Sequence, residues 1–279
     1  MTTQVKVRPA GAQLAVVLGA TADIGHHICK RLLAEGWQVV GLGRSDTRVS
    51  DLRLMQGFTF HACDLANAES VKAALAEITR QKIVWDLFVS CAGTMEPIGR
   101  FFDLDFDDWA QSTVVNFTAQ LRVLHGLWPL RRQYSPVHIM LMAGGGTNNS
   151  FTNYSAYCVS KIALIKMVEL IDDEEGLANA FIIGPGFVHT RMHEETQRAG
   201  NKAGPGLAKT QAFLKTPGTS LDDIYQHLRW CMDAGRGIAG GRNFSTVHDH
   251  WRGGGDLLRQ SLAGDCDAFK LRRHKDKTE

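Results

Sequence analysis

A tyrosine and a lysine four residues apart form the clearest chemical pair in the sequence. Tyr157 and Lys161 bound the segment Tyr157-Cys-Val-Ser-Lys161, and this spacing places both side chains on one face of a helix. A phenol with a pKa of about 10 is a poor acid–base catalyst at neutral pH, and a nearby ammonium lowers that pKa. The pair therefore predicts proton transfer by Tyr157, with Lys161 poising the phenol.

A glycine-rich turn lies between an apolar run and a helical pattern near the start of the chain. Glycines at such a turn bring backbone N–H groups close to a pyrophosphate at a helix N-terminus. A carboxylate is unfavourable there, so we expect Asp23 to point away or to cap the helix. The candidate cofactor-binding residues of the turn are Gly19, Thr21, Asp23, Ile24 and Gly25.

Short β-branched runs alternate with segments of helical period along most of the chain, and this alternation predicts parallel strands covered by helices on both faces. The expected fold is a doubly wound α/β sheet of about seven strands, whose ligand crevice lies beyond their carboxyl ends. The expected strands are 14–18, 38–42, 58–62, 84–90, 137–142, 178–183 and, more weakly, 241–247. The expected helices are 24–35, 67–80, 106–127, 155–173 and 221–232.

No composition break divides the chain, so we expect one domain over residues 14–252. It would lie between a loose segment, 1–13, and a tail, 253–279, that begins with glycines and ends in a basic run. Lys+Arg minus Asp+Glu is 31 − 29 = +2, which argues against a nucleic-acid partner. No apolar run is long enough to span a membrane. Six scattered cysteines without a CxxC pair predict reduced thiols in a cytoplasmic protein and no metal site.

The turn from Gly19 to Gly25 resembles the Thr-Gly-x-x-x-Gly-x-Gly turn of the short-chain dehydrogenase/reductase family. Leu18 replaces the usual threonine, and Asp23 replaces the middle glycine. Further motifs are similar to those of the family and follow in its order: Asp64-Leu65 after the third strand, Ser90-Cys91-Ala92-Gly93 after the fourth, Asn116 in the next helix, the Tyr157/Lys161 pair, and Pro185-Gly186-Phe-Val188-His-Thr190 after the sixth strand.

The resemblance implies a Rossmann-like fold and an NAD(P)-dependent oxidoreductase, which transfers a hydride between nicotinamide and the carbonyl or alcohol of a small-molecule substrate. It also implies a homodimer or homotetramer, and a polar, mobile lid over residues 192–216. Asn116 would join Tyr157 and Lys161 in catalysis. The implied cofactor contacts are Asp64, Leu65, Cys91, Ala92, Gly93, Lys161, Pro185, Gly186, Val188 and Thr190.

The end of the second strand selects the cofactor. Gly43 occupies the position at which an acidic residue would accept hydrogen bonds from the 2′-hydroxyl of NAD(H), and Arg44 and Ser45 follow it. A guanidinium pairs well with a 2′-phosphate, so NADP(H) is favoured. NAD(H) is the alternative, with Arg44 solvated and Asp46 on the ribose.

The serine that the family carries thirteen residues before the tyrosine is missing. Gly144 takes its place within Met142-Ala-Gly-Gly-Gly-Thr147. Three interpretations stay open: Thr147 or a backbone N–H replaces the serine as an oxyanion donor, the Tyr157/Lys161 pair works alone and more slowly, or catalysis is lost. In the last case the protein would bind nucleotide as a sensor or scaffold.

Overall fold

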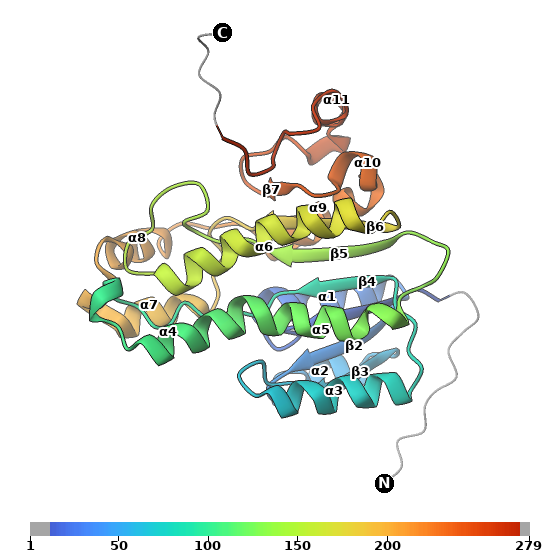
Figure 1. Ribbon diagram of the computed structural model, residues 1–279, viewed down its shortest axis with the longest axis horizontal. Coiled ribbons are helices and arrows are strands. Elements are labelled where there is room, and N and C mark those ends of the chain that lie inside the picture. Colours follow the sequence, from blue (N-terminus) through green and yellow to red (C-terminus); the bar gives the residue numbers. More distant parts are fainter. Residues whose placement is uncertain (1–11, 274–279) are drawn as a thin grey trace.

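Seven parallel strands form one sheet in the computed structural model, which describes residues 12–273 (Figure 1). Their order across the sheet is β3-β2-β1-β4-β5-β6-β7, and the predicted Rossmann-like doubly wound sheet is confirmed. The strands are β1 (Leu14–Leu18), β2 (Gln38–Gly43), β3 (Phe58–Ala62), β4 (Leu87–Ser90), β5 (Val137–Met142), β6 (Ala178–Gly184) and β7 (Asn243–Ser245).

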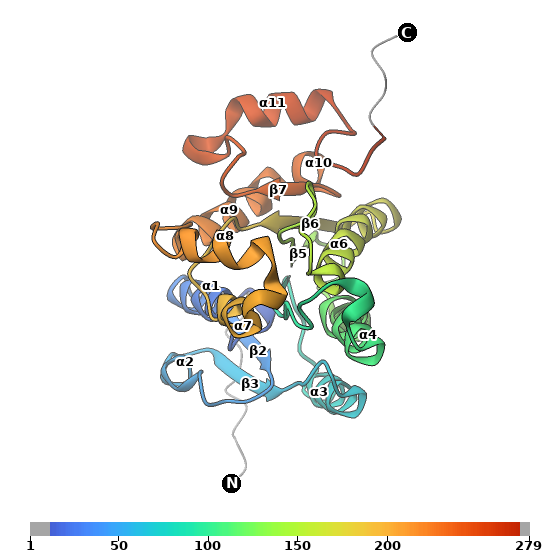
Figure 2. The same cartoon turned by 90° about the vertical axis from the view of Figure 1, so that its left-hand side faces the viewer.

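Helices cover both faces of the sheet, as Figure 2 shows. One layer contains α1 (Asp23–Ala34), α2 (Ser50–Leu54), α9 (Leu221–Ala234), α10 (Arg236–Ala239) and α11 (Asp256–Gly264). The other contains α3 (Ala68–Arg80), α4 (Phe106–Thr113), α5 (Ala119–Leu127) and α6 (Ser155–Glu174). Two further helices, α7 (Met192–Ala199) and α8 (Pro205–Phe213), lie at the carboxyl ends of the strands (Figure 1).

The apolar runs of the strands follow from this double cover. In β1, Ala15 and Val17 pack against the α1 layer, whereas Val16 and Leu18 pack against the α3 layer. Successive side chains of a strand point to opposite faces, so a strand buried on both faces needs a continuous apolar sequence.

The strand order reverses at β1, which pairs with β2 on one side and with β4 on the other. The crossovers from β1 and from β4 therefore leave in opposite directions, and a crevice opens at the carboxyl ends of these strands. The sequence places the glycine turn, the Ala92-Gly93 turn and the Gly144 loop at this edge.

The predicted helix over residues 106–127 contains a π-helical segment, Val114–Thr118, between α4 and α5. A π turn frees backbone carbonyls from their usual partners. The side chain of Gln120 donates to the carbonyls of Val115 (3.1 Å), Asn116 (2.9 Å) and Ala92 (3.1 Å). This amide gives hydrogen-bond donors to the carbonyls of the irregular turn and links the turn to the end of β4.

Residues 192–216, expected to be a polar lid loop, are largely helical. Four residues of α7 at helical spacing (Met192, Glu195, Thr196 and Ala199) turn inward, and Pro205 begins α8, where its fixed φ suits the first helical turn. The prediction of a loop was wrong because the polar outer face of α7 masked this short inward pattern.

The chain after residue 252 is also more ordered than expected. It contains α11, whose Leu262 is buried, and Phe269 packs against the same core cluster. Arg272 forms an ion pair with Glu169 of α6 at 2.6 Å. The loose tail predicted from Gly253 is therefore wrong up to residue 273. Residues 274–279 and most of the predicted N-terminal segment 1–13 lie outside the described residues.

Candidate active site

The turn after β1 presents unpaired backbone donors. Gly19 has φ +84°, and a Cβ there would lie 2.7 Å from the backbone nitrogen of Ala92. A Cβ on Gly25 would lie 2.2 Å from the carbonyl oxygen of Gly19. The N–H groups of Asp23, Ile24 and Gly25 donate to no acceptor within residues 12–273. Free donors in the first turn of α1 fit an anion such as a diphosphate.

Asp23 points away from these donors and does not cap α1, because Ala22 is the N-cap residue. Its carboxylate accepts from the backbone nitrogen of Arg191 at 3.0 Å and faces the guanidinium groups of Arg191 (3.5 Å) and Arg48 (3.3 Å). The Arg191 guanidinium also donates to the carbonyl of Thr21 at 2.8 Å. The unusual carboxylate is thus neutralised by two arginines, one of which precedes α7.

The end of β2 has room only for glycine at residue 43. A Cβ there would lie 2.9 Å from the hydroxyl of Thr21. Arg44 is exposed and forms no ion pair in the described part of the chain, whereas Asp46 pairs with Arg53 at 2.9 Å. The exposed Ser45 shares a hydrogen bond with Thr47 at 3.1 Å. An uncommitted guanidinium therefore stands beside the crevice, while the nearby carboxylate is engaged.

The turn after β4 lies beside the first turn, and the turn after β3 lies beside the end of β2. Asp64 accepts from the backbone nitrogen of Ala66 at 3.0 Å, and Leu65 is buried. Burial raises the pKa of the Cys91 thiol to about 12, so this residue stays neutral. Gly93 borders two of the predicted catalytic residues, because a Cβ there would lie 2.9 Å from Asn116 Oδ1 and 3.8 Å from Lys161 Nζ.

Asn116 lies in the π segment and is fully buried. Its Oδ1 accepts from the backbone nitrogen of Thr94 at 3.0 Å, and its Nδ2 donates to the Thr94 carbonyl at 2.9 Å and to Ser112 Oγ at 3.2 Å. The amide therefore holds the turn that follows Gly93. Its expected part in catalysis stays a prediction.

Tyr157 and Lys161 are both buried on the first turns of α6. Lys161 Nζ donates to the Met142 carbonyl at 2.9 Å and lies 5.6 Å from the centre of the Tyr157 ring. Burial lowers the pKa of Lys161 to about 8. Burial also raises the pKa of Tyr157 above its ordinary value, and charges on Cys158 and Glu195 add to the rise.

The pKa of Tyr157 thus moves in the direction opposite to the sequence expectation. The physical reason is that desolvation disfavours the charged form of both groups. Tyr157 is therefore a protonated phenol at neutral pH, and it has no hydrogen-bond partner within residues 12–273.

The hydroxyl of Tyr157 fills the space that a side chain at residue 144 would need. A Cβ on Gly144 would lie 2.0 Å from that oxygen. Thr147, the candidate for the missing hydroxyl, donates to the Gly144 carbonyl at 3.2 Å. Its hydroxyl closes the glycine turn instead of standing free.

The segment after β6 completes the crevice. Pro185 leads into Gly186, which has φ +73° and lies against Val247 and Thr219. Val188 is buried, and its carbonyl pairs with the His193 ring at 2.9 Å. Thr190 accepts from the backbone nitrogen of His193 at 3.2 Å, so it begins the turn into α7.

Two residues that sequence reasoning did not single out belong to the site. The methyl group of Met192 would lie 3.7 Å from a Cβ on Gly93. The carboxylate of Glu195 accepts from the backbone nitrogen of Met95 (2.6 Å) and the hydroxyl of Thr94 (3.1 Å). The signal that could have found them is their spacing of three on the apolar face of a short helix.

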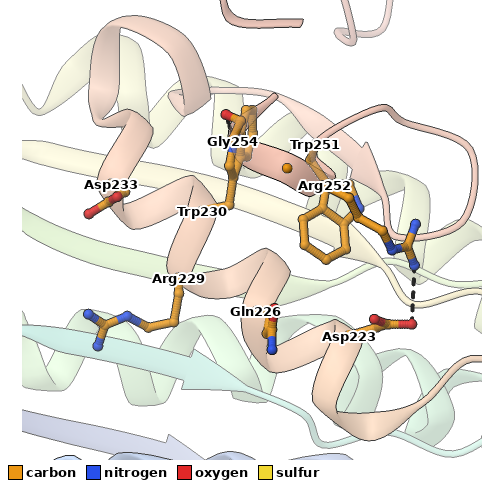
Figure 3. Close-up of a pocket in the computed structure, with 9 residues that line it drawn as sticks. Asp223, Gln226, Arg229, Trp230, Asp233, Trp251, Arg252 and Gly254 are labelled. Carbon is orange, nitrogen blue, oxygen red and sulfur yellow. Dashed lines mark hydrogen bonds and ion pairs between the residues drawn. The ribbon is translucent and has the colours of Figure 1, made fainter. Parts of the chain in front are cut away.

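A separate hollow of about 430 Å³ lies between α9 and residues 251–254 (Figure 3). Arg252 pairs with Asp223 at 3.1 Å and stacks over Trp251, and Trp230 Nε1 donates to the Gly254 carbonyl at 2.8 Å. These contacts fasten the chain after β7 to α9. They hold the outer layer of the fold and take no part in the crevice.

The chain belongs to the short chain dehydrogenase family, whose sequence pattern matches residues 13–201. It is 27% identical over 200 residues to benzil reductase ((S)-benzoin forming) of Bacillus subtilis, covering 68% of this chain and 80% of that protein. It is also 27% identical over 200 residues to a probable NADP-dependent dehydrogenase of Haemophilus influenzae, covering 66% and 77%.

A solved structure shares the fold. The ligand-free aldohexose dehydrogenase of Thermoplasma acidophilum superposes with a TM-score of 0.70 at 19% identity, over 84% of this chain and 92% of that one. Membership of the family makes the protein an oxidoreductase and suggests a nicotinamide cofactor, which the free donors of the first turn fit. The predicted family is confirmed.

Residues 12–273 contain no candidate membrane span and no candidate metal cluster. Within residues 12–273, no helix is long and apolar enough to cross a membrane. In the same part of the chain, no group of three His, Cys, Asp or Glu residues is placed to hold a metal ion. All six cysteines are free thiols, four of them buried.

Proposed function

We propose that the protein is an NADP(H)-dependent reductase of small-molecule carbonyl compounds. The observation that carries the proposal is the convergence of Tyr157, Lys161, Asn116 and Gly93 at the carboxyl ends of β4 and β5. In this family the nicotinamide, when bound, supplies or accepts the hydride at its C4 atom. The protein's own residues must then place the substrate and handle one proton.

Tyr157 is the group that would handle this proton. Its hydroxyl gives a proton to the carbonyl oxygen in reduction and takes one from the alcohol in oxidation. The raised pKa of Tyr157 keeps it protonated near neutral pH, which suits the reductive direction. Lys161, on the same side of α6, is the cation available for the cofactor ribose, and Asn116 keeps the Gly93 turn in place.

The preference for NADP(H) rests on three residues at and just after the end of β2. Arg44 is exposed and uncommitted in the described chain, and a guanidinium suits a 2′-phosphate. Asp46 already pairs with Arg53, and Gly43 lies against Thr21, so neither position offers a carboxylate to a ribose hydroxyl. The curated relative named as a probable NADP-dependent dehydrogenase agrees with this choice.

For the missing serine, we propose that donors of the 144–147 turn take its place. Thr147 can serve as a donor if its hydroxyl breaks its hydrogen bond to the Gly144 carbonyl and donates to the substrate oxygen instead. The backbone N–H groups of the turn are the other available donors. We also propose a cytoplasmic homodimer or homotetramer. The cytoplasm suits six unpaired cysteines, and the oligomer rests on the family alone.

A second candidate is a nucleotide-binding protein without turnover. Two observations favour it: the buried phenol of Tyr157 has a raised pKa, and residue 144 carries no hydroxyl. A binding protein needs only the β1 turn and Arg44, whereas a reductase also needs Tyr157.

The experiment compares the protein with its Tyr157→Phe variant. NADPH oxidation is followed with a panel of ketones, aldehydes and keto-sugars, and the NADPH dissociation constant is measured in parallel. We expect the substitution to lower kcat about 10²- to 10⁴-fold with little change in NADPH affinity. The reductase proposal is wrong if the protein binds NADPH tightly but turns over no substrate, and if the substitution changes neither result. The second candidate, a nucleotide-binding protein, then takes its place.

A further inference from the structure

One charged side chain lies on the inward face of α7. Met192 and Ala199 of this face pack with the apolar cluster that contains Tyr157, and the buried Thr196 accepts a hydrogen bond from Tyr154 at 3.0 Å. Glu195 is half-buried on the same face, whereas Glu194, Gln197 and Arg198 point outward and are exposed. A carboxylate on the buried side of an amphipathic helix is costly unless it has a partner.

The protein supplies hydrogen bonds but no positive charge to this carboxylate. Oε2 accepts from the Met95 backbone nitrogen (2.6 Å) and from Thr94 Oγ1 (3.1 Å). The backbone N–H of Glu96 also hydrogen-bonds to this carboxylate, and no cation pairs with Glu195 within residues 12–273. An ionised carboxylate has about four acceptor positions, so three donors leave room for one more from a ligand.

The position of this carboxylate is fixed beside the reacting groups. Thr94 is held on both backbone atoms by Asn116, and Met95 packs in the same cluster as Tyr157. The charge of Glu195 also contributes, after burial and Cys158, to the raised pKa of Tyr157. An anion anchored this close to the proton donor acts on any substrate that reaches Tyr157.

We propose that Glu195 determines substrate specificity by binding an ammonium or hydroxyl group next to the reacting carbonyl, and by excluding substrates that carry a carboxylate there. The inference rests on the proposed reductase function and names its substrate class: amino or hydroxy ketones and the matching alcohols. A hydrogen bond between an ammonium and a carboxylate is strong in a partly dry site, and a second carboxylate is repelled there.

A purely structural role makes a different prediction. If Glu195 only fastens α7 over the Gly93 turn, its charge is irrelevant to the substrate. Glu195→Gln separates the two roles, because the amide oxygen can still accept from Met95 and Thr94 while the negative charge is lost. Glu194→Gln is the matched control, since it makes the same change on the exposed face of α7.

The experiment uses three phenyl ketones that differ only in the group attached to the carbonyl carbon. They are 2-amino-1-phenylethanone, 2-hydroxy-1-phenylethanone and benzoylformate. Steady-state kinetics with NADPH are measured at pH 6.5, where the amine is largely protonated. We expect kcat/KM to follow the order amine, hydroxyl, carboxylate. Glu195→Gln should lower kcat/KM for the amine about 10-fold or more, mainly through KM, and should raise it for benzoylformate.

An amine-to-carboxylate ratio of kcat/KM that changes less than about threefold in Glu195→Gln overturns the inference, as does an equal change in Glu194→Gln. Calorimetric binding of the same ketones to the NADPH complex separates this result from failure of the reductase proposal. A protein that reduces none of the ketones, yet binds the amine through Glu195, contradicts the reductase and supports the specificity role. Charge-independent binding by an inactive protein contradicts both.

Discussion

The turn after β1 and the turn after β5 both depend on glycine, but the missing side chain makes room for different atoms. At Gly19 and Gly25 the space is taken by backbone, and the result is a close turn with free N–H groups. At Gly144 the space is taken by the Tyr157 hydroxyl. The first turn stays closely packed with free donors despite Asp23, whereas the second changes the surroundings of the proposed proton donor, Tyr157.

The difference shows how each departure from the family pattern is accommodated. Asp23 is exposed enough to turn outward, where Arg48 and Arg191 neutralise it. Gly144 has no such freedom, because Tyr157 is buried against it. A substitution in the β1 turn should therefore affect folding and nucleotide binding, and one in the β5 turn should affect catalysis.

The largest effect is expected in the first turn. In Gly25→Ala the new Cβ meets the Gly19 carbonyl, which cannot move without opening the turn. We expect the free energy of unfolding to fall by about 3 kcal/mol and NADPH binding to be lost, as measured by urea unfolding and by titration.

Gly237→Ala in α10 is the matched control for this change, because nothing lies within 4 Å of its added Cβ. It should raise stability by about 0.5–1 kcal/mol. Equal stabilities of the two variants would show that the close approach at Gly25 does not matter.

The next effect tests the second turn. Gly144→Ser supplies the hydroxyl that the family carries, but its Cβ would displace the Tyr157 oxygen. We expect kcat to fall about 10²-fold with NADPH affinity unchanged, because a misplacement of about 1 Å at the proton donor is enough for such a loss. A rise in kcat would mean instead that Tyr157 adapts and that the serine was simply missing.

The smallest effect is expected at the end of β2. Arg44→Asp should weaken NADPH binding about 10-fold or more and leave NADH binding unchanged or stronger, because it removes the cation proposed for the 2′-phosphate. Lys30→Glu on the exposed side of α1 makes the same change of charge away from this position. If the ratio of the two dissociation constants stays the same in Arg44→Asp, the cofactor preference is wrong.

Much of the fold could be predicted because its signals are local. The boundaries of β1, β3 and β5 were predicted to the residue, since apolar runs between turns mark buried strands. Residues 192–216 and 253–273 were misread as loop and tail. Their helices are short and carry glycines at their ends. Packing against the rest of the protein stabilises these helices, and this contribution cannot be read from the local sequence.

The candidate site shows the same division. The identities of Tyr157, Lys161 and Asn116 and the turn at Gly19 could be found from spacing and family resemblance. The raised pKa of Tyr157 could not, because burial depends on elements from the whole chain, including Met95 and α7.

The sequence by itself determined the strand pattern, the glycine turn and the order of the family's motifs, because each depends on residues close together in the chain. Only the tertiary structure decided what fills the space at Gly144, where the Asp23 carboxylate turns, and that Glu195 lies near Tyr157. These outcomes depend on contacts between segments as far apart as residues 23 and 191. Side-chain volume and charge act through space, and the fold alone sets which groups meet.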